Sequence, residues 1–443
     1  MIEETTVQPL RWQTLVSLLL AMFVIALGYG FLLPILPFMI ERIAGTPDAA
    51  TLSRHSGLLT GAYTLALFLF APLWGRIADR RGRRPVILLG LVGFAVTLAL
   101  FALADSLPRL YLGRLLNGLF ASAITPAAYA LVGDHAPSKE WRAHRFALLN
   151  IVGASGFLVG PMLGGFTLFV THEFLPQLGE AVAFRSPFFV TSGFAFLVAL
   201  AVWMLVPVTA ARKIDPRVTA NGPDGHLALR RLLAISFVTA AAVGAFEVGL
   251  SLRGTRILGM NSLQIGLMFT ECSLVMLIVQ TTVFSPLLKP EVTRWFLTPA
   301  LAILAAGLIA VPFAMGPITL AVAVALVSAS AGVLSPIATY WISLGAGETQ
   351  GTELGRQTAA ASLGQAVGSA SGGLLFGATF LPNASFMLTA AAVLAGLVAS
   401  IGIPRLLAQP RYQGPGERRA ASLGDADLSE LAIERRRKGS EQT

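Results

Sequence analysis

Charge is what this sequence has least of. Only 12% of its 443 residues are charged, whereas 55% are hydrophobic. A soluble chain of this length needs a far more polar surface, so the composition indicates an all-α protein that crosses a membrane several times. The net charge of +9 does not indicate nucleic-acid binding, because the basic residues stand at the ends of apolar runs, where they orient a chain in a bilayer.

Residues that carry enzymatic or metal chemistry are equally scarce. The single cysteine, Cys272, excludes an intrachain disulfide. All five histidines fall in predicted loops or at helix ends, which argues against a histidine proton relay and against a buried metal site. The sequence contains no phosphate-binding loop, nucleophile elbow or Cys/His metal spacing. It therefore gives no support to enzymatic activity, ATP-driven transport or a bound cofactor.

Long apolar runs, in contrast, are abundant. A membrane-spanning helix needs about 20 apolar residues, and by this measure we predict twelve. The connections are short except for one segment, which is rich in proline, glycine and charge and separates two sets of six helices. The predicted helices cover residues 13–40, 56–75, 85–104, 108–133, 143–170, 186–207, 230–252, 262–287, 294–314, 317–344, 354–380 and 383–404.

The distribution of basic residues predicts the orientation. Of the 32 Lys and Arg residues, 25 lie at the two termini and in the loops after even-numbered helices. Because positive residues favour the cytoplasmic side, both termini are predicted to be cytoplasmic. The predicted segments are a cytoplasmic N-terminus (1–12), a first six-helix half (13–207), a cytoplasmic central loop (208–229), a second six-helix half (230–404) and a basic cytoplasmic tail (405–443).

An internal repeat indicates that the two halves are related. Gly156, Gly160, Gly164 and Gly165 in the fifth predicted helix recur as glycines exactly 208 positions later in the eleventh, from Gly364 onward. Small residues at these spacings also serve simple helix packing, so one run alone would say little. Two runs at one offset predict parallel halves related by an axis along the membrane normal.

A short charged segment, Gly75–Pro85, separates two uncharged runs. It holds five arginines and one aspartate, and its order G-x-x-x-D-R-x-G-R-R resembles the signature turn between helices 2 and 3 of the major facilitator superfamily. A bare basic loop is the alternative. The resemblance implies a latch on the cytoplasmic face in the outward-open state, in which Asp79 and Arg83 form a charge cluster with Asp134. Its motif residues here are Gly75, Asp79, Arg80, Gly82 and Arg83, with Asp134 at the end of the fourth predicted helix.

Three further motifs resemble the twelve-helix drug:proton antiporter branch of that superfamily. The first predicted helix carries Leu27-Gly28 followed by Pro34 and Pro37, and the fourth carries Arg114, Asn117 and Gly118. The alternatives are a kink needed only for packing and an arginine that snorkels to the outer surface. The fifth helix resembles the motif associated with antiporters, which implies export and a smooth face for a sliding helix. That motif comprises Gly156, Gly160, Pro161, Gly164 and Gly165.

Two acidic residues lie inside predicted spans, Glu271 near mid-membrane and Glu247 nearer the outer side. A carboxyl group inside a bilayer is favoured in its neutral form and can therefore carry a proton. The alternative is a purely structural acid, protonated or paired with arginine. The first helix has no acid between Trp12 and Glu41, unlike antiporters of this branch that keep coupling acids there. We rank Glu271 first as the proton carrier and Glu247, with Arg114, second.

Together these features predict a major facilitator transporter that exports drugs or small metabolites, such as siderophores, in exchange for protons. Its expected partners are a small-molecule substrate, protons and the lipid bilayer, and it is expected to be a monomer in the plasma membrane, the inner membrane of a bacterium. Two alternatives remain: a symporter that imports a nutrient, and a non-transporting sensor or scaffold. The predicted substrate cavity comprises Tyr29, Arg114, Asn117, Glu247 and Glu271.

Overall fold

A computed structural model describes residues 9–45, 49–174, 180–208, 223–260, 262–283, 288–347, 349–376 and 383–408. Every regular element in these residues is helical. The elements are α1 (Trp12–Ala44), α2 (Ala49–Arg81), α3 (Arg83–Ala102), α4 (Leu107–Asp134), α5 (Lys139–Phe174), α6 (Glu180–Leu205), α7 (Pro223–Arg256), α8 (Ser262–Val283), η2 (Pro290–Phe296), α9 (Leu297–Ala310), η3 (Val311–Phe313), α10 (Pro317–Gly345), α11 (Gln350–Phe376), α12 (Ala384–Ser400) and the short α13 (Ile403–Leu406).

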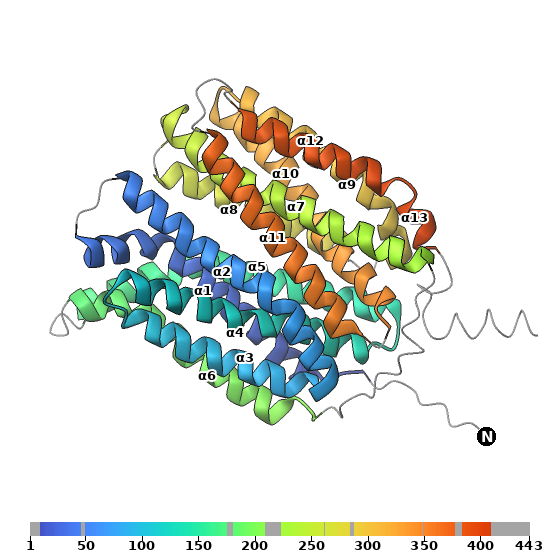
Figure 1. The fold of residues 1–443 in the computed structure, drawn as a ribbon, viewed down its shortest axis with the longest axis horizontal. Helices are drawn as coiled ribbons and strands as arrows, with labels where there is room; N and C mark the ends of the chain where they lie inside the picture. Colours follow the sequence, from blue (N-terminus) through green and yellow to red (C-terminus); the bar gives the residue numbers. More distant parts are fainter. Residues whose placement is uncertain are drawn as a thin grey trace, which may run out of the picture.

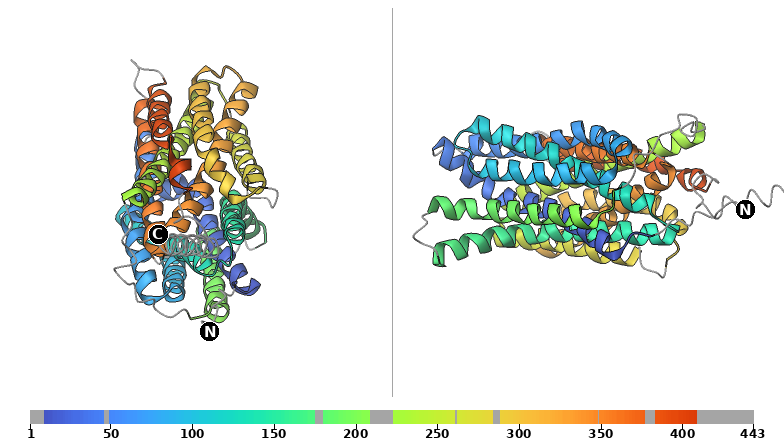
Figure 2. Two further views of the ribbon diagram at one scale, coloured as in Figure 1. Left: turned by 90° about the vertical axis from the view of Figure 1, so that its right-hand side faces the viewer. Right: turned by 90° about the horizontal axis from the view of Figure 1, so that it is seen from below.

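The helices form two halves, α1–α6 and α7–α12, which lie one above the other in Figure 1 and run along the length of the bundle (Figure 2). In the first half α1 packs against α5 and α6, and α4 packs against α2 and α3. The second half repeats this pattern, with α7 against α11 and α12, and α10 against α8 and α9. The structure therefore confirms the predicted all-helical architecture of two pseudo-symmetric halves.

The composition of the helices suits a bilayer. Within the described residues, nine stretches are long and apolar enough to cross a membrane, and α8 and α12 contain shorter apolar stretches, Leu267–Val283 and Ala384–Ser400. Large apolar side chains such as Leu197 and Val398 are exposed on the outside of the bundle, where lipid chains can cover them. Lipid chains offer no hydrogen-bond partners to the backbone. A helix meets this condition because its N–H and C=O groups bond to each other.

Two predicted boundaries need correction. The charged segment is not a loop, because α2 continues to Arg81 and only Gly82 breaks the helix, at a φ of 95° that favours glycine. Residues 223–229 of the predicted central loop belong to α7, which begins at a proline, a residue well suited to the first helical turn. Residues 209–222 of that loop and 409–443 of the predicted tail lie outside the described residues.

The glycine runs of the repeat pack two helix pairs closely. A Cβ atom added at Gly160 would lie 2.6 Å from the Phe31 nitrogen of α1, and one added at Gly368 would lie less than 3.0 Å from the Ala241 oxygen of α7. Such distances leave no room for a side chain. The partner of the α5 run is therefore α1, inside the same half, which is where any sliding of that face would occur. Pro161 and Gly165 lie in the same helix.

Candidate functional site

One end of the bundle, which we call the basic end, holds the segment Gly75–Pro85. There the Asp79 carboxylate is fully buried and accepts hydrogen bonds from the backbone N–H groups of Gly351 (3.0 Å) and Thr352 (2.7 Å) and from the Thr352 hydroxyl (2.6 Å). These residues form the first turn of α11, whose N–H groups have no partners within the helix and carry partial positive charge. Asp79 of the first half thus caps a helix of the second half.

Arg83 holds this carboxylate in place. Its guanidinium forms an ion pair with Asp79, and its Nε donates to Asp134 Oδ2 at 3.1 Å. Arg83 is buried, because Gly82 turns the chain sharply between α2 and α3. The structure brings together the three residues that the sequence analysis grouped as a charge cluster. Arg80 lies one position away from the cluster, with an exposed side chain.

Below the cap, α2 and α11 meet backbone to backbone. A Cβ atom added at Gly351 would lie 2.6 Å from the Gly75 oxygen, and one added at Gly355 would lie 2.5 Å from the Ala71 oxygen. The two helices lie side by side between the halves in Figure 1. Glycines at these positions therefore allow the two backbones to touch, whereas any larger residue would push the two helices apart.

Two more side chains connect the halves at the basic end. Arg142 of α5 donates to the Gly133 oxygen of α4 (2.8 Å) and to the Ser343 oxygen of α10 (3.1 Å), so one cation serves the carboxyl ends of two matched helices. Lys139, the first residue of α5, forms an ion pair with Glu291 at 3.6 Å. These contacts hold the halves together at this end.

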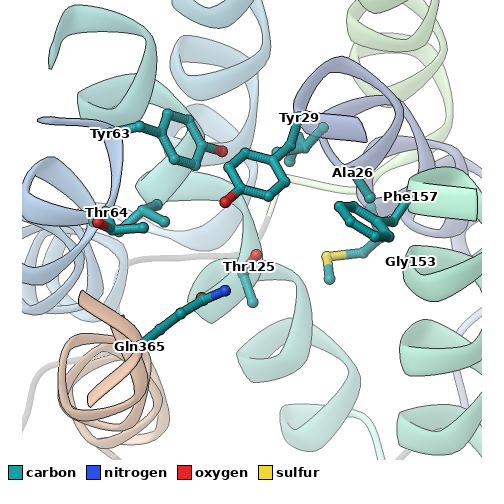
Figure 3. Close-up of a pocket in the computed structure, with 11 residues that line it drawn as sticks. Ala26, Tyr29, Tyr63, Thr64, Thr125, Gly153, Phe157 and Gln365 are labelled. Atoms are coloured by element: carbon teal, nitrogen blue, oxygen red, sulfur yellow. The ribbon is translucent and has the colours of Figure 1, made fainter. Parts of the chain in front are cut away.

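A cavity of about 230 Å³ lies between the halves, near the middle of the helices that line it (Figure 3). Ten of its eleven lining residues come from the first half and one, Gln365, from α11. The lining residues are Met22, Ile25, Ala26, Tyr29, Tyr63, Thr64, Leu67, Thr125, Gly153, Phe157 and Gln365.

Aromatic rings form one wall of this cavity. Tyr29 stacks on Tyr63 with a centroid distance of 5.2 Å and on Phe157 with 5.9 Å. The Arg114 guanidinium lies 4.4 Å from the Tyr63 centroid and 5.5 Å from that of Tyr29. Arg114 is 1% exposed, so it does not snorkel to a surface, and its Nε and Nη2 have no hydrogen-bond partner within the described part of the chain. The aromatic faces are its neighbours.

The two intramembrane acids occupy different surroundings. Glu247 of α7 interacts with the Gln365 side chain and lies close enough to Tyr29 for an electrostatic interaction. Neither Glu247 nor the partly exposed Glu271 of α8 is among the cavity-lining residues, but Gln365 and Tyr29, two neighbours of Glu247, are. The structure therefore places Glu247, rather than the first-ranked Glu271, beside the cavity.

Two other predicted placements need correction. Arg114 and Glu247 do not pair in the structure, because Arg114 lies against the rings of Tyr29 and Tyr63 while Glu247 meets Gln365. Asn117 does not face the cavity. Its amide donates to the Phe94 oxygen and to Thr97 Oγ1 of α3, both at 3.3 Å, inside the first half.

Of the eleven lining residues, only Tyr29 belongs to the predicted substrate cavity. The ten that were missed include Tyr63, Phe157 and Gln365, and the sequence held a usable signal for the last two. Phe157 directly follows Gly156 and Gln365 directly follows Gly364, so they are matched by the same 208-residue offset as the glycines. Tyr63 lies in an uncharged run that gave no such indication.

Comparison with known proteins fits this geometry. Residues 18–369 match the model of the Major Facilitator Superfamily. The chain belongs to this superfamily. It is therefore a membrane-embedded secondary transporter of small molecules and not an enzyme.

Individual members of the superfamily are similar over different lengths. Multidrug resistance protein 2 of Bacillus subtilis (strain 168) is 27% identical over 82% of this chain and 88% of its own length. The class E tetracycline resistance protein of Escherichia coli is 34% identical over 42% of this chain and 43% of its own length. Among solved structures, the human organic anion transporter MFSD10 superimposes with a TM-score of 0.73 at 23% identity, covering 89% of this chain and 100% of its own, which shows the shared fold.

Proposed function

We propose that this transporter exports an amphipathic small molecule from the cytoplasm in exchange for protons. Two relatives are named for resistance to several drugs or to tetracycline, which supports export of a drug-like compound or a native metabolite. The glycine-proline motif of α5 supports antiport. Neither relative is named for siderophores, so we do not retain that example.

In this proposal the basic end faces the cytoplasm of the cell that carries the transporter in its plasma membrane. The excess of Lys and Arg in the loops at this end supports that orientation. The contacts of Asp79, Arg142 and Lys139 then close the cytoplasmic side, and the cavity communicates with the outside. Alternating access requires the opposite state too, in which α2 and α11 part and the cap on α11 is lost.

Glu247 is our candidate for the proton carrier. It belongs to the second half, yet it adjoins a cavity lined mostly by the first half, so its surroundings change when the halves rock. The neighbours of Glu247 that the electrostatic interactions identify are Gln365, Tyr29 and Cys272, and none of these carries a positive charge. A carboxyl group without a counterion is favoured in its neutral form inside a membrane and loses the proton when water reaches it. Glu271 is the second candidate.

The observation that carries the proposal is this juxtaposition of an intramembrane acid with a partly apolar, partly polar cavity. The test is flux in proteoliposomes with tetracycline and ethidium as probes and an imposed pH gradient. Wild type should move a probe against its gradient while protons move the other way. Glu247→Gln should abolish uphill movement but keep downhill exchange, because Gln nearly preserves the shape of the cavity.

Each contrary result has a distinct meaning. Movement of probe and protons in one direction would indicate an importing symporter. No flux of any probe would favour a sensor or scaffold. If Glu247→Gln still pumps with wild-type proton stoichiometry while Glu271→Gln does not, Glu271 is the carrier.

A further inference from the structure

We propose that Phe157 and Gln365 are the specificity-determining pair of the cavity and that they orient one class of substrate, a compact planar aromatic compound with a hydrogen-bonding group at one end. The aromatic part lies against Phe157 in the first half, and the hydrogen-bonding group meets Gln365 in the second. This inference rests on the proposed function, since it names the substrate class of the same site.

The repeat places the two side chains at equivalent positions. A Cβ atom added at Gly156 would lie less than 3.0 Å from the Phe23 oxygen of α1, and one added at Gly364 would lie less than 3.0 Å from the Phe237 oxygen of α7. Each glycine therefore lies in close backbone contact with its partner helix. Successive residues of an α-helix are rotated by about 100° around its axis. With each glycine fixed against its partner helix, the next residue must therefore point the same way in both halves. Both next residues, Phe157 and Gln365, line the cavity.

The chemistry of the two positions is opposite. The ring of Phe157 is tilted 30° from that of Tyr29, and the ring of Tyr29 is tilted 29° from that of Tyr63, so each neighbouring pair of rings is stacked and Phe157 stands at one end of the stack. An aromatic compound gains most from such faces, in an offset-stacked or edge-on arrangement. Gln365 instead extends its amide toward the centre of the cavity from the other side (Figure 3). An amide both donates and accepts hydrogen bonds.

Phe157 and Gln365 therefore orient a bound ligand across the boundary between the halves, with its ring in the first half and its hydrogen-bonding group in the second. A ligand with both features bridges the halves, whereas a ligand with one feature contacts only one of them. The cavity volume of about 230 Å³ is below the range of roughly 300–1,000 Å³ for drug-sized pockets, so a compact ring system fits best. Glu247 adjoins Gln365, so the hydrogen-bonding end of the ligand comes to lie near the proposed proton carrier.

The test measures equilibrium binding to purified protein in nanodiscs, with no pH gradient. The probes are 2-naphthamide, which has both features, 2-ethylnaphthalene, which lacks the amide, and decalin-2-carboxamide, which lacks the aromatic ring. We expect wild type to bind 2-naphthamide most tightly. Phe157→Leu should weaken 2-naphthamide roughly 3- to 10-fold and leave decalin-2-carboxamide unchanged. Gln365→Leu should weaken 2-naphthamide by a similar factor and leave 2-ethylnaphthalene unchanged.

Two controls separate this pattern from misfolding. Phe157→Tyr keeps the ring and should therefore keep the preference for 2-naphthamide over decalin-2-carboxamide, which Phe157→Leu reduces. Phe166→Leu makes the same kind of change on α5 at a side chain that is 64% exposed, so it should alter none of the affinities. A misfolded variant would lose every probe, whereas the proposal requires each variant to spare one.

The inference and the proposed function fail in different ways. If both leucine variants bind all three probes as wild type does, or if wild type binds none of them, the inference is wrong, whatever the flux assay shows. If the predicted binding pattern appears but wild type moves no probe against its gradient in the flux assay, the inference is supported and the proposed export is wrong.

Discussion

The two halves meet in two matched places, α2 with α11 and α5 with α8 and the η2 turn that follows it, and these crossings are built differently. At the first, α11 presents Gly351 and Gly355 to the backbone of α2. The positions 208 residues earlier on α5 hold Ala143 and Ala147. At the α2–α11 crossing, no side chain of α11 separates the two backbones at these positions. The matched positions of α5 carry the methyl groups of Ala143 and Ala147.

The charged contacts also indicate that the α2–α11 crossing is the tighter of the two. Asp79 is fully buried and bonds directly to the first turn of α11, whereas Glu291 of η2 is 33% exposed and reaches α5 only through the buried Lys139 side chain at 3.6 Å. The bonds of Asp79 are short, buried and charge-assisted, whereas the Lys139–Glu291 pair is a single longer contact whose carboxylate is partly open to solvent, so it contributes less. We infer that the α2–α11 crossing is the firm contact of the closed state and the α5–α8 crossing the weaker one.

Gly355→Leu should have the largest effect. The new side chain would start 2.5 Å from the Ala71 oxygen, so the basic end could not close, and transport of tetracycline should fall to background. The matched control is Gly61→Leu in α2, because nothing lies within 4 Å of a Cβ atom there. Flux in proteoliposomes with equal amounts of inserted protein is the measurement. Normal flux in Gly355→Leu would mean that close contact is not needed at this crossing.

Neutralising the acid of each crossing, Asp79 and Glu291, should compare the two crossings by their charged contacts. Asp79→Asn removes the ion pair with Arg83 and leaves a buried cation without full compensation, so we expect at least about a tenfold loss of flux. Glu291→Gln removes a single longer ion pair whose carboxylate is partly exposed, and the loss should stay below about threefold. The same flux assay ranks the two variants. Equal losses of flux in the two variants would show that both crossings matter equally and that the α2–α11 crossing is not the firmer one.

Ala147→Gly should have the smallest effect. Making α5 resemble α11 at this position should lower the free energy of unfolding by about 0.5–1 kcal/mol, because glycine weakens a helix interior. Flux should remain within about twofold of wild type. Thermal unfolding of the purified protein and flux of the variant provide the two measurements. A large gain or loss of flux would indicate that the α5–α8 crossing depends on backbone contact after all.

Features that repeat along the chain or that carry charge could be predicted from the sequence. The long apolar runs gave the helices, the 208-residue offset gave the related halves, and the charged segment led to Asp79, Arg83 and Asp134. It could not find the partners of Asp79 on α11, because backbone N–H groups have no signature in the sequence and lie 272 positions away. Pairing Arg114 with Glu247 failed for another reason: opposite charges suggested a pair, but aromatic rings provide the neighbours of the buried cation.

Arg142 has a consequence for the speed of the transport cycle. Its two carbonyl acceptors belong to different halves, and only Gly133 belongs to the same half as α5. When the halves part, Ser343 leaves with α10 while the guanidinium keeps Gly133. An arginine that must be ordered again from free rotation loses about 1.5–2 kcal/mol of side-chain entropy. We infer that Arg142, held by Gly133 within its own half, avoids that loss at each return to the closed state, which favours rapid reclosing.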